Sequence, residues 1–76
     1  MLTKTENKII VYLKNNCNSE RNLTRSSISR NLKLDLRGTY VSTNNLKIKG
    51  YVEYVLINKL ESKVKLTQKG ELLLVL

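Results

Sequence analysis

The stretch that decides the fold is ISRNLKLDLRGTYVSTNNLKIKGYVEY, which runs from Ile28 to Tyr54. In it, Ile28 and Leu32 stand four residues apart, as residues on one face of a helix do. After Gly50 the spacing of apolar residues changes to about two, which indicates a strand rich in β-branched and aromatic residues. The stretch therefore predicts a helix, a turn, a second helix and the start of a β-hairpin.

The boundaries of the two helices follow from capping residues. The earlier helix should run from about Thr24 to Leu32, with Thr24 as N-cap and Leu23 and Ile28 in the positions of a hydrophobic staple. A turn follows at residues 33–35, where Leu34 is expected to fill the core. The next helix should start near Asp35 or Leu36 and end before Gly50. Its core-facing row is expected to be Leu36, Thr39, Thr43, Leu46 and Gly50.

Further elements are expected on both sides of this stretch. A helix from about Thr3 to Asn16 should begin with a capping box made by Thr3 and Glu6 and should bury Ile9 and Leu13. Residues 51–57 and 63–66 should form two strands around a polar loop, and a final helix should run from Gln68 to Leu76. The fold class is thus mostly α with a β-hairpin, in the order α-α-α-β-β-α, as one domain over residues 1–76.

Two segments of the chain carry a family resemblance. The segment Ile28 to Tyr54 resembles the helix, turn, recognition helix and entry into the wing of winged helix-turn-helix proteins. The segment KVKLTQKGELLL, from Lys63 to Leu74, is similar to the LTxKG stretch that closes many such domains. Multiple-antibiotic-resistance regulators and small archaeal, viral and plasmid regulators share it. The chain departs from the family pattern at Lys33, where a glycine is often found. The resemblance implies a transcriptional regulator that binds DNA.

The charge of the chain favours the same partner. Fourteen Lys and Arg against six Asp and Glu give a formal net charge of +8 in 76 residues, which attracts polyanions. The alternative is that the charge serves solubility. Charged residues interrupt the N-terminus, so it does not resemble a signal peptide, and no stretch reaches the roughly 18 apolar residues of a membrane span. We expect a cytoplasmic protein, nucleoid-associated or in the host-cell cytoplasm if viral.

Catalytic and metal sites are not expected. The sequence has no His, one Cys and three Gly, and its six carboxylates show no pairing or metal-ligand spacing. We therefore expect neither an enzyme nor a protein with a cofactor or a metal. Cys17 is interpreted as a half-buried small hydrophobic residue. The alternative, a redox sensor, would need a cation that lowers its pKa, and Arg21 is the nearest in sequence.

The third helix is the candidate DNA reader. Arg can bind guanine and Asn can bind adenine through two hydrogen bonds each, and a Val methyl can contact the thymine methyl. The face opposite the core carries these residue types, and Tyr40 and Ser42 could reach phosphates or bases. The candidates on this helix are Arg37, Thr39, Tyr40, Val41, Ser42, Asn44, Asn45 and Lys49. The alternative is an ordinary solvated helix face.

Two other segments supply candidate DNA contacts. Near the start of the second helix, Arg25, Ser26 and Arg30 could bind phosphates. In the hairpin, Lys59, Lys63 and Lys65 could lie along the backbone or enter the minor groove. Glu61 beside them favours the backbone. The alternatives are ordinary surface charge and lysines that protect an edge strand from aggregation.

The C-terminal run is the clue to assembly. A helix over this run would be apolar on every side, so one face could cover the core and another could pair with a second chain. The predicted homodimer interface is Leu72, Leu73, Leu74, Val75 and Leu76. The alternative is a C-terminus that packs on its own domain.

Taken together, these features of the sequence predict a homodimeric, sequence-specific regulator bound to double-stranded DNA. The alternatives are a winged-helix protein-interaction module and a nonspecific DNA-binding protein.

Overall fold

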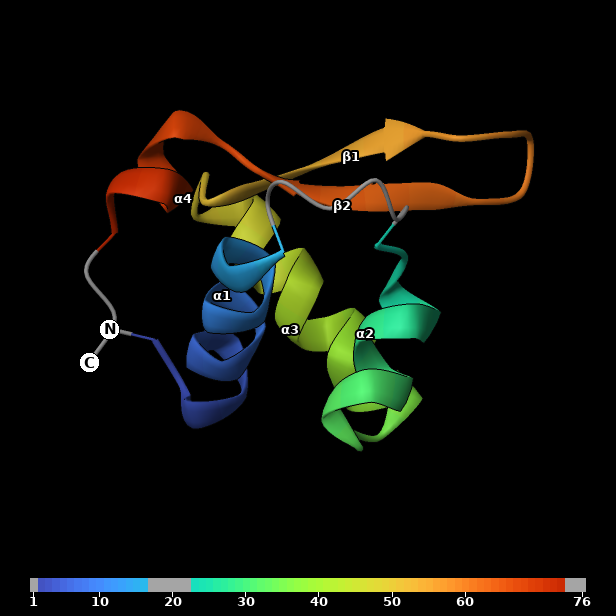
Figure 1. Cartoon of the computed structure of the whole chain (residues 1–76), viewed down its shortest axis with the longest axis horizontal. Helices are drawn as coiled ribbons and strands as arrows, with labels where there is room; N and C mark the ends of the chain where they lie inside the picture. The colour runs from blue at the N-terminus through green and yellow to red at the C-terminus, as the bar shows by residue number, and fades with distance from the viewer. Residues whose placement is uncertain (1, 17–22, 74–76) are drawn as a thin grey trace.

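A computed structural model describes residues 2–16 and 23–73. Within these ranges the elements are three helices, a two-stranded hairpin and a short fourth helix: α1 (Lys4–Asn15), α2 (Arg25–Leu32), α3 (Leu36–Ile48), β1 (Val52–Leu56), β2 (Ser62–Leu66) and α4 (Gln68–Leu72). The hairpin lies across one side of the three longer helices and extends beyond α2 (Figure 1). This confirms the predicted order α-α-α-β-β-α.

Helix α1 begins with the predicted capping box. The Glu6 amide donates to the Thr3 hydroxyl at 3.1 Å, and the Thr3 amide donates to the Glu6 carboxylate at 3.2 Å. Two orphan donors at the helix start are satisfied in this way. Three apolar side chains of α1, Ile9, Ile10 and Leu13, are buried and form one wall of the core.

The turn between α2 and α3 closes without glycine. Lys33 adopts the left-handed conformation, with φ 55° and ψ 42°, which costs a non-glycine residue about 1–2 kcal/mol. Its amide donates to the Arg30 carbonyl at 3.3 Å, and the Leu34 amide donates to the Ser29 carbonyl at 2.8 Å. Leu34 packs against the core, as predicted. The departure at Lys33 therefore leaves the geometry of the turn intact.

Helix α3 buries Thr39, Thr43 and Leu46, and its N-cap is Asp35, whose carboxylate accepts from the Gly38 amide at 3.2 Å. The prediction that Leu36 faces the core is wrong, because this side chain is exposed. Leu36 is the first residue of α3, and the first turn of α3 lies at the α2 end of the molecule, away from α1 and the hairpin (Figure 1).

The hairpin is joined to the helices on one face. β1 and β2 pair antiparallel, from Val52 opposite Leu66 to Leu56 opposite Ser62. The segment just before α2 runs beside β2 and pairs with it through one β-bridge. The Val64 amide donates to the Leu23 carbonyl at 2.7 Å. Val52, Val64 and Leu66 are buried against the helices, so period-two alternation sets which face of the hairpin packs on them.

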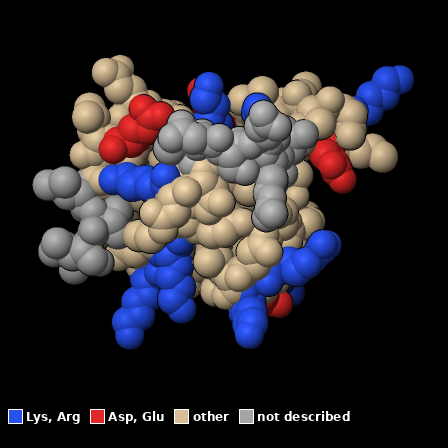
Figure 2. Space-filling model, in the orientation of Figure 1, with Lys and Arg blue, Asp and Glu red and all other residues tan. Residues whose placement is uncertain are grey.

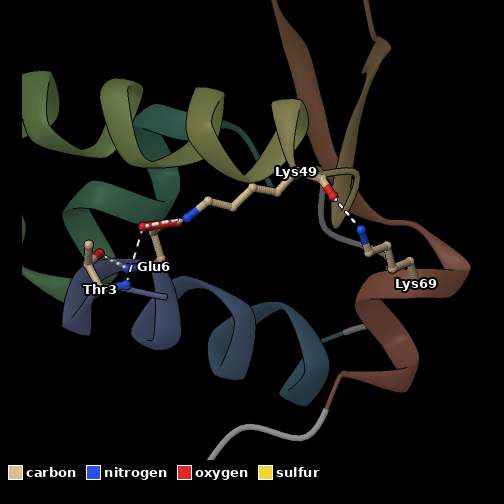
Figure 3. Close-up of polar contacts among 4 residues, drawn as sticks. All are labelled: Thr3, Glu6, Lys49 and Lys69. Atoms are coloured by element: carbon tan, nitrogen blue, oxygen red, sulfur yellow. Dashed lines mark hydrogen bonds and ion pairs between the residues drawn. The ribbon is translucent and has the colours of Figure 1, made fainter. Parts of the chain in front are cut away.

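The two segments that carry the family resemblance pack against each other. Gly50 takes φ 86° at the end of α3, and its carbonyl accepts from the Thr67 hydroxyl at 2.6 Å. The Lys69 ammonium donates to the Lys49 carbonyl at 2.8 Å (Figure 3). Gly70 lies so close to the Tyr51 backbone that an added Cβ would stand 2.1 Å from the Tyr51 carbonyl oxygen. The KGY and LTQKG segments thus form one packed corner.

The final helix is shorter than predicted. Helix α4 ends at Leu72, and Leu73 is extended, with φ −67° and ψ 126°, so the prediction of a helix through Leu73 is wrong. Leu73 packs against the core instead, and its carbonyl accepts from the Lys14 ammonium. Cys17 and Arg21, and the predicted interface residues Leu74, Val75 and Leu76, lie outside the described residues.

Candidate nucleic-acid interface

The face of α3 opposite the core carries four of the predicted DNA readers. Arg37, Val41, Asn44 and Asn45 are all exposed, and the turn of about 100° per residue groups them on one side of the helix. Ile48, which was not predicted, joins this face seven residues after Val41 and is 75% exposed. Its position in the helical period could have revealed it, because two heptad-spaced residues lie on the same side of a helix.

Three other predicted α3 residues lie elsewhere. Thr39 is wholly buried and its hydroxyl donates to the Asp35 carbonyl at 2.9 Å, so the prediction that it contacts DNA is wrong. Thr39 belongs to the row that packs on the core, which excludes it from any surface. Ser42 is half-buried at the edge of the exposed face. Tyr40 is exposed on the other edge, beside α2.

Lys49 also lies away from the predicted face. Its ammonium is 2.9 Å from the Glu6 carboxylate, which is 2% exposed, so the pair joins the end of α3 to the start of α1 (Figure 3). Burial raises the pKa of the Glu6 carboxyl, but hydrogen bonds from Lys49 and Thr3 and the Lys49 charge lower it. The net effect is a pKa below its ordinary value. The prediction that Lys49 lies on the outward face with the DNA readers is wrong, since α3 ends at Ile48 and the Lys49 ammonium reaches Glu6 at the start of α1.

The Arg25 guanidinium makes cation–π contacts with two tyrosine rings. Its guanidinium carbon lies 4.4 Å from the ring centre of Tyr40 on α3 and 5.0 Å from that of Tyr54 on β1. The Lys47 ammonium lies 5.0 Å from the same Tyr54 ring. These cation–π contacts connect α2, α3 and the hairpin and restrict the rotamers of Arg25. No local pattern in the sequence points to Lys47 or Tyr54, because the contacting residues come from three different elements.

A small hollow lies between the start of α2 and the end of the hairpin. Its volume is about 230 Å³, and its lining includes Arg25, Ser26, Tyr40 and Leu60.

The other predicted phosphate contacts lie on α2 and the hairpin. Ser26 and Arg30 are exposed on α2. On the hairpin, Lys59 is exposed. Lys63 is half-buried, and its backbone forms an antiparallel β-bridge with Thr24. Figure 2 shows Lys and Arg side chains projecting from several edges of the molecule, including the end of the hairpin at the upper right.

The end of the hairpin is fixed by its own hydrogen bonds and is partly apolar. The Asn58 side-chain oxygen accepts from the Leu60 amide at 2.8 Å and from the Glu61 amide at 3.0 Å. Leu60 is 94% exposed, and Leu56 is also exposed. The loop is mostly polar in sequence, so its composition does not point to these two exposed leucines.

Known structures share this architecture. MepR of Staphylococcus aureus, a transcription regulator of the multidrug efflux pump MepA, superposes with a TM-score of 0.82 at 18% identity, over 92% of this chain and 50% of MepR. FabT of Streptococcus pneumoniae, solved in complex with DNA, gives a TM-score of 0.74 at 31% identity, over 95% of this chain and 48% of FabT. A MarR-family transcriptional regulator from Rhodococcus sp. RHA1 gives 0.75 at 16% identity, over 91% and 47%. The chain has a winged helix-turn-helix fold.

The chain spans about half the length of these regulators. No protein-family model matches its sequence, and no curated protein matches it significantly. By their positions in this fold, α2 and α3 form the helix-turn-helix and the β1–β2 hairpin is the wing. Arg25 therefore connects the helix-turn-helix to the wing.

Of the predicted dimer interface, the residues that the structure describes are Leu72 and Leu73. Leu72 is 72% exposed on α4, on the predicted dimer interface, whereas Leu73 is half-buried. Within residues 2–16 and 23–73, no group of three or more His, Cys, Asp and Glu side chains could hold a metal ion. In the same part of the chain, no helix has the length and apolar character needed to cross a membrane.

Proposed function

We propose that this winged helix-turn-helix domain binds double-stranded DNA sequence-specifically and regulates transcription. Recognition helix α3 lies in the major groove, and the wing lies on the backbone or in the minor groove. The observation that carries this proposal is the exposed α3 face, where Arg37, Asn44 and Asn45 offer side chains that can bond base edges. The net charge of +8 supports it, and so do the DNA complexes solved for MepR and FabT.

The remaining predicted contacts serve the phosphate backbone in this proposal. Ser26 and Arg30 on α2, with the oriented guanidinium of Arg25, face one strand, and Lys59 and Lys63 of the wing face the other side of the site. Such contacts fix the register of the protein on the duplex and carry no sequence information directly. Thr39 and Lys49 have no part in it, because one is buried and the other pairs with Glu6.

The proposed regulator is a cytoplasmic homodimer and not an enzyme. Leu72 leaves apolar surface in water, and pairing with a second chain would remove it. Two-fold symmetry would place two recognition helices about 34 Å apart, one turn of DNA, so the operator would be an inverted repeat.

A second candidate function rests on the wing. Leu60 and Leu56 give its end an apolar surface, which favours a protein partner over phosphate. In that case the domain would be a protein-interaction module and would not enrich any DNA sequence.

Selection from a pool of random duplexes tests the proposal. We expect one enriched sequence, bound at least about a thousandfold more tightly than its scrambled version. The logarithm of the affinity should fall with the logarithm of the salt concentration at a slope of about −5 to −7 per dimer, which corresponds to six to eight neutralised phosphates. Binding with no enriched sequence would indicate a nonspecific DNA-binding protein. No binding even at low salt would reject a nucleic-acid function.

A further inference from the structure

We infer that α3 is built to read A·T base pairs, and that Ile48 and Val41 do so by contacting thymine methyl groups. The inference rests on the proposed function and names the class of DNA sequence that the same face accepts. It depends on which side chains the fold leaves on the exposed face of α3 and which it removes.

The fold removes the cations from most of this face. Within residues 36–49, all of which the structure describes, four side chains that are not fully buried carry polar groups besides Arg37 and the asparagines: Tyr40, Ser42, Lys47 and Lys49. Ser42 is half-buried at the edge of the face. Lys49 is paired with Glu6, and the Lys47 ammonium lies over the Tyr54 ring. Tyr40 stacks on Arg25. Beyond the first turn of α3, the outward face is therefore left to Val41, Asn44, Asn45 and Ile48.

The four remaining side chains match the chemistry of an A·T pair in the major groove. Adenine offers one acceptor and one donor to the amide of Asn, and thymine offers its C5 methyl to an apolar side chain. Val41 is 57% exposed and Ile48 is 75% exposed, on the same side as Asn44. β-Branched residues are weak helix formers, and exposing them gives no packing in return. Contact with thymine methyls gives these two exposed side chains a partner.

The geometry also predicts the order of bases. From Arg37 to Ile48 the helix axis rises about 16 Å, so a helix that lies in the major groove presents the two side chains to opposite ends of the half-site. Arg37, in the first turn, is suited to one guanine through two hydrogen bonds. The expected half-site is therefore a single G·C pair followed by a run of A·T pairs.

Thymine-to-uracil substitution tests the methyl contacts directly, because uracil pairs as thymine does but lacks the methyl. The enriched duplex from the random pool is remade with uracil at each thymine in turn, and its affinity is measured by fluorescence anisotropy for the wild type, Ile48→Ala, Val41→Ala and the control Val11→Ala. Val11 is exposed on α1. For the wild type, uracil at one or two positions of the half-site should weaken binding about two- to fourfold each, the factor for one buried methyl.

The variants assign each methyl to its side chain. Ile48→Ala should weaken binding to the thymine duplex by a similar factor and should abolish the effect of uracil at one position, and Val41→Ala should do the same at another. Val11→Ala should leave all effects unchanged. An enriched half-site with G·C pairs opposite Asn44 and Ile48, or uracil duplexes bound as tightly as thymine duplexes, would overturn the inference and leave the proposed function standing. Failure to enrich any duplex would overturn both.

Discussion

The substitution Lys49→Met tests whether Lys49 stabilises the fold or contacts DNA. The sequence predicts a DNA contact at this residue, whereas the structure pairs its ammonium with Glu6. Its ammonium lies 2.9 Å from a Glu6 carboxylate that is 2% exposed. Removing it leaves a buried carboxylate with the Thr3 contacts alone, while Met keeps the aliphatic stem. Hydrogen bonds to charged groups contribute about 1.5–3 kcal/mol. The Lys49 side chain is itself 37% exposed, so screening by water reduces the cost to about 1–2 kcal/mol.

This cost should appear in thermal unfolding followed by circular dichroism. For a domain of this size, about 1–2 kcal/mol lowers the Tm by roughly 4–16 °C. The double variant Glu6→Gln, Lys49→Met should lose less stability than the sum of the two single variants. Lys65→Met, which removes an exposed lysine of β2, is the matched control and should change the Tm little.

The pH dependence of the Tm provides a second test of the contact between Lys49 and Glu6. The pKa of Glu6 in the folded protein lies below the ordinary 4.5, so its ionised form stabilises the fold above that pH. This stability is lost as the pH falls through the lowered folded pKa. The Tm difference between wild type and Lys49→Met should therefore be large at about pH 7 and small near pH 3. A Lys49→Met protein that keeps the wild-type Tm but loses DNA affinity would refute this reasoning and return Lys49 to the DNA-binding face.

Three further substitutions test other contacts. Gly70→Ala should lower the stability by about 1–3 kcal/mol, seen as a lower urea midpoint, because its Cβ would stand 2.1 Å from the Tyr51 carbonyl oxygen; an unchanged midpoint would contradict the packed corner. Lys33→Gly should raise the Tm by a few degrees, since glycine adopts φ 55° without the roughly 1 kcal/mol strain of a lysine, and a lower Tm would argue against that conformation. Leu72→Glu should convert a dimer to a monomer in sedimentation equilibrium, and a wild-type protein at its monomer mass of 8.8 kDa would reject the homodimer.

Local signals in the sequence predicted the elements well. Thr3, Thr24, Asp35 and Thr67 each cap the helix that was expected from them, because a cap needs only residues within four positions of it. The end of α4 was different. The run of apolar residues from Leu72 predicted a longer helix, but Leu73 is extended and packs against the core. This contact depends on tertiary packing, which the spacing of apolar residues along one helix does not reveal.

The candidate site was predicted where a single helix defines it and missed where several elements meet. The helical period of α3 correctly predicted that Arg37, Val41, Asn44 and Asn45 lie on its exposed face. Ile48 also lies on this face but was not predicted. The pairing of Lys49 with Glu6 spans 43 positions, and the cations over Tyr54 come from α2 and α3. Such contacts depend on the packing of helices against the hairpin, which no local pattern in the sequence determines.

The central claim is that DNA binds the face formed by α3, the start of α2 and the wing. NMR of the ¹⁵N-labelled protein titrated with the enriched duplex tests it most directly, because each amide reports on its own surroundings. We expect the largest shifts on Arg25, Ser26 and the amides of Arg37 to Ile48, with smaller ones along the wing. The amides of exposed α1 residues such as Val11 should shift little. Shifts that concentrate on α1 and α4, with α3 unchanged, would contradict the account.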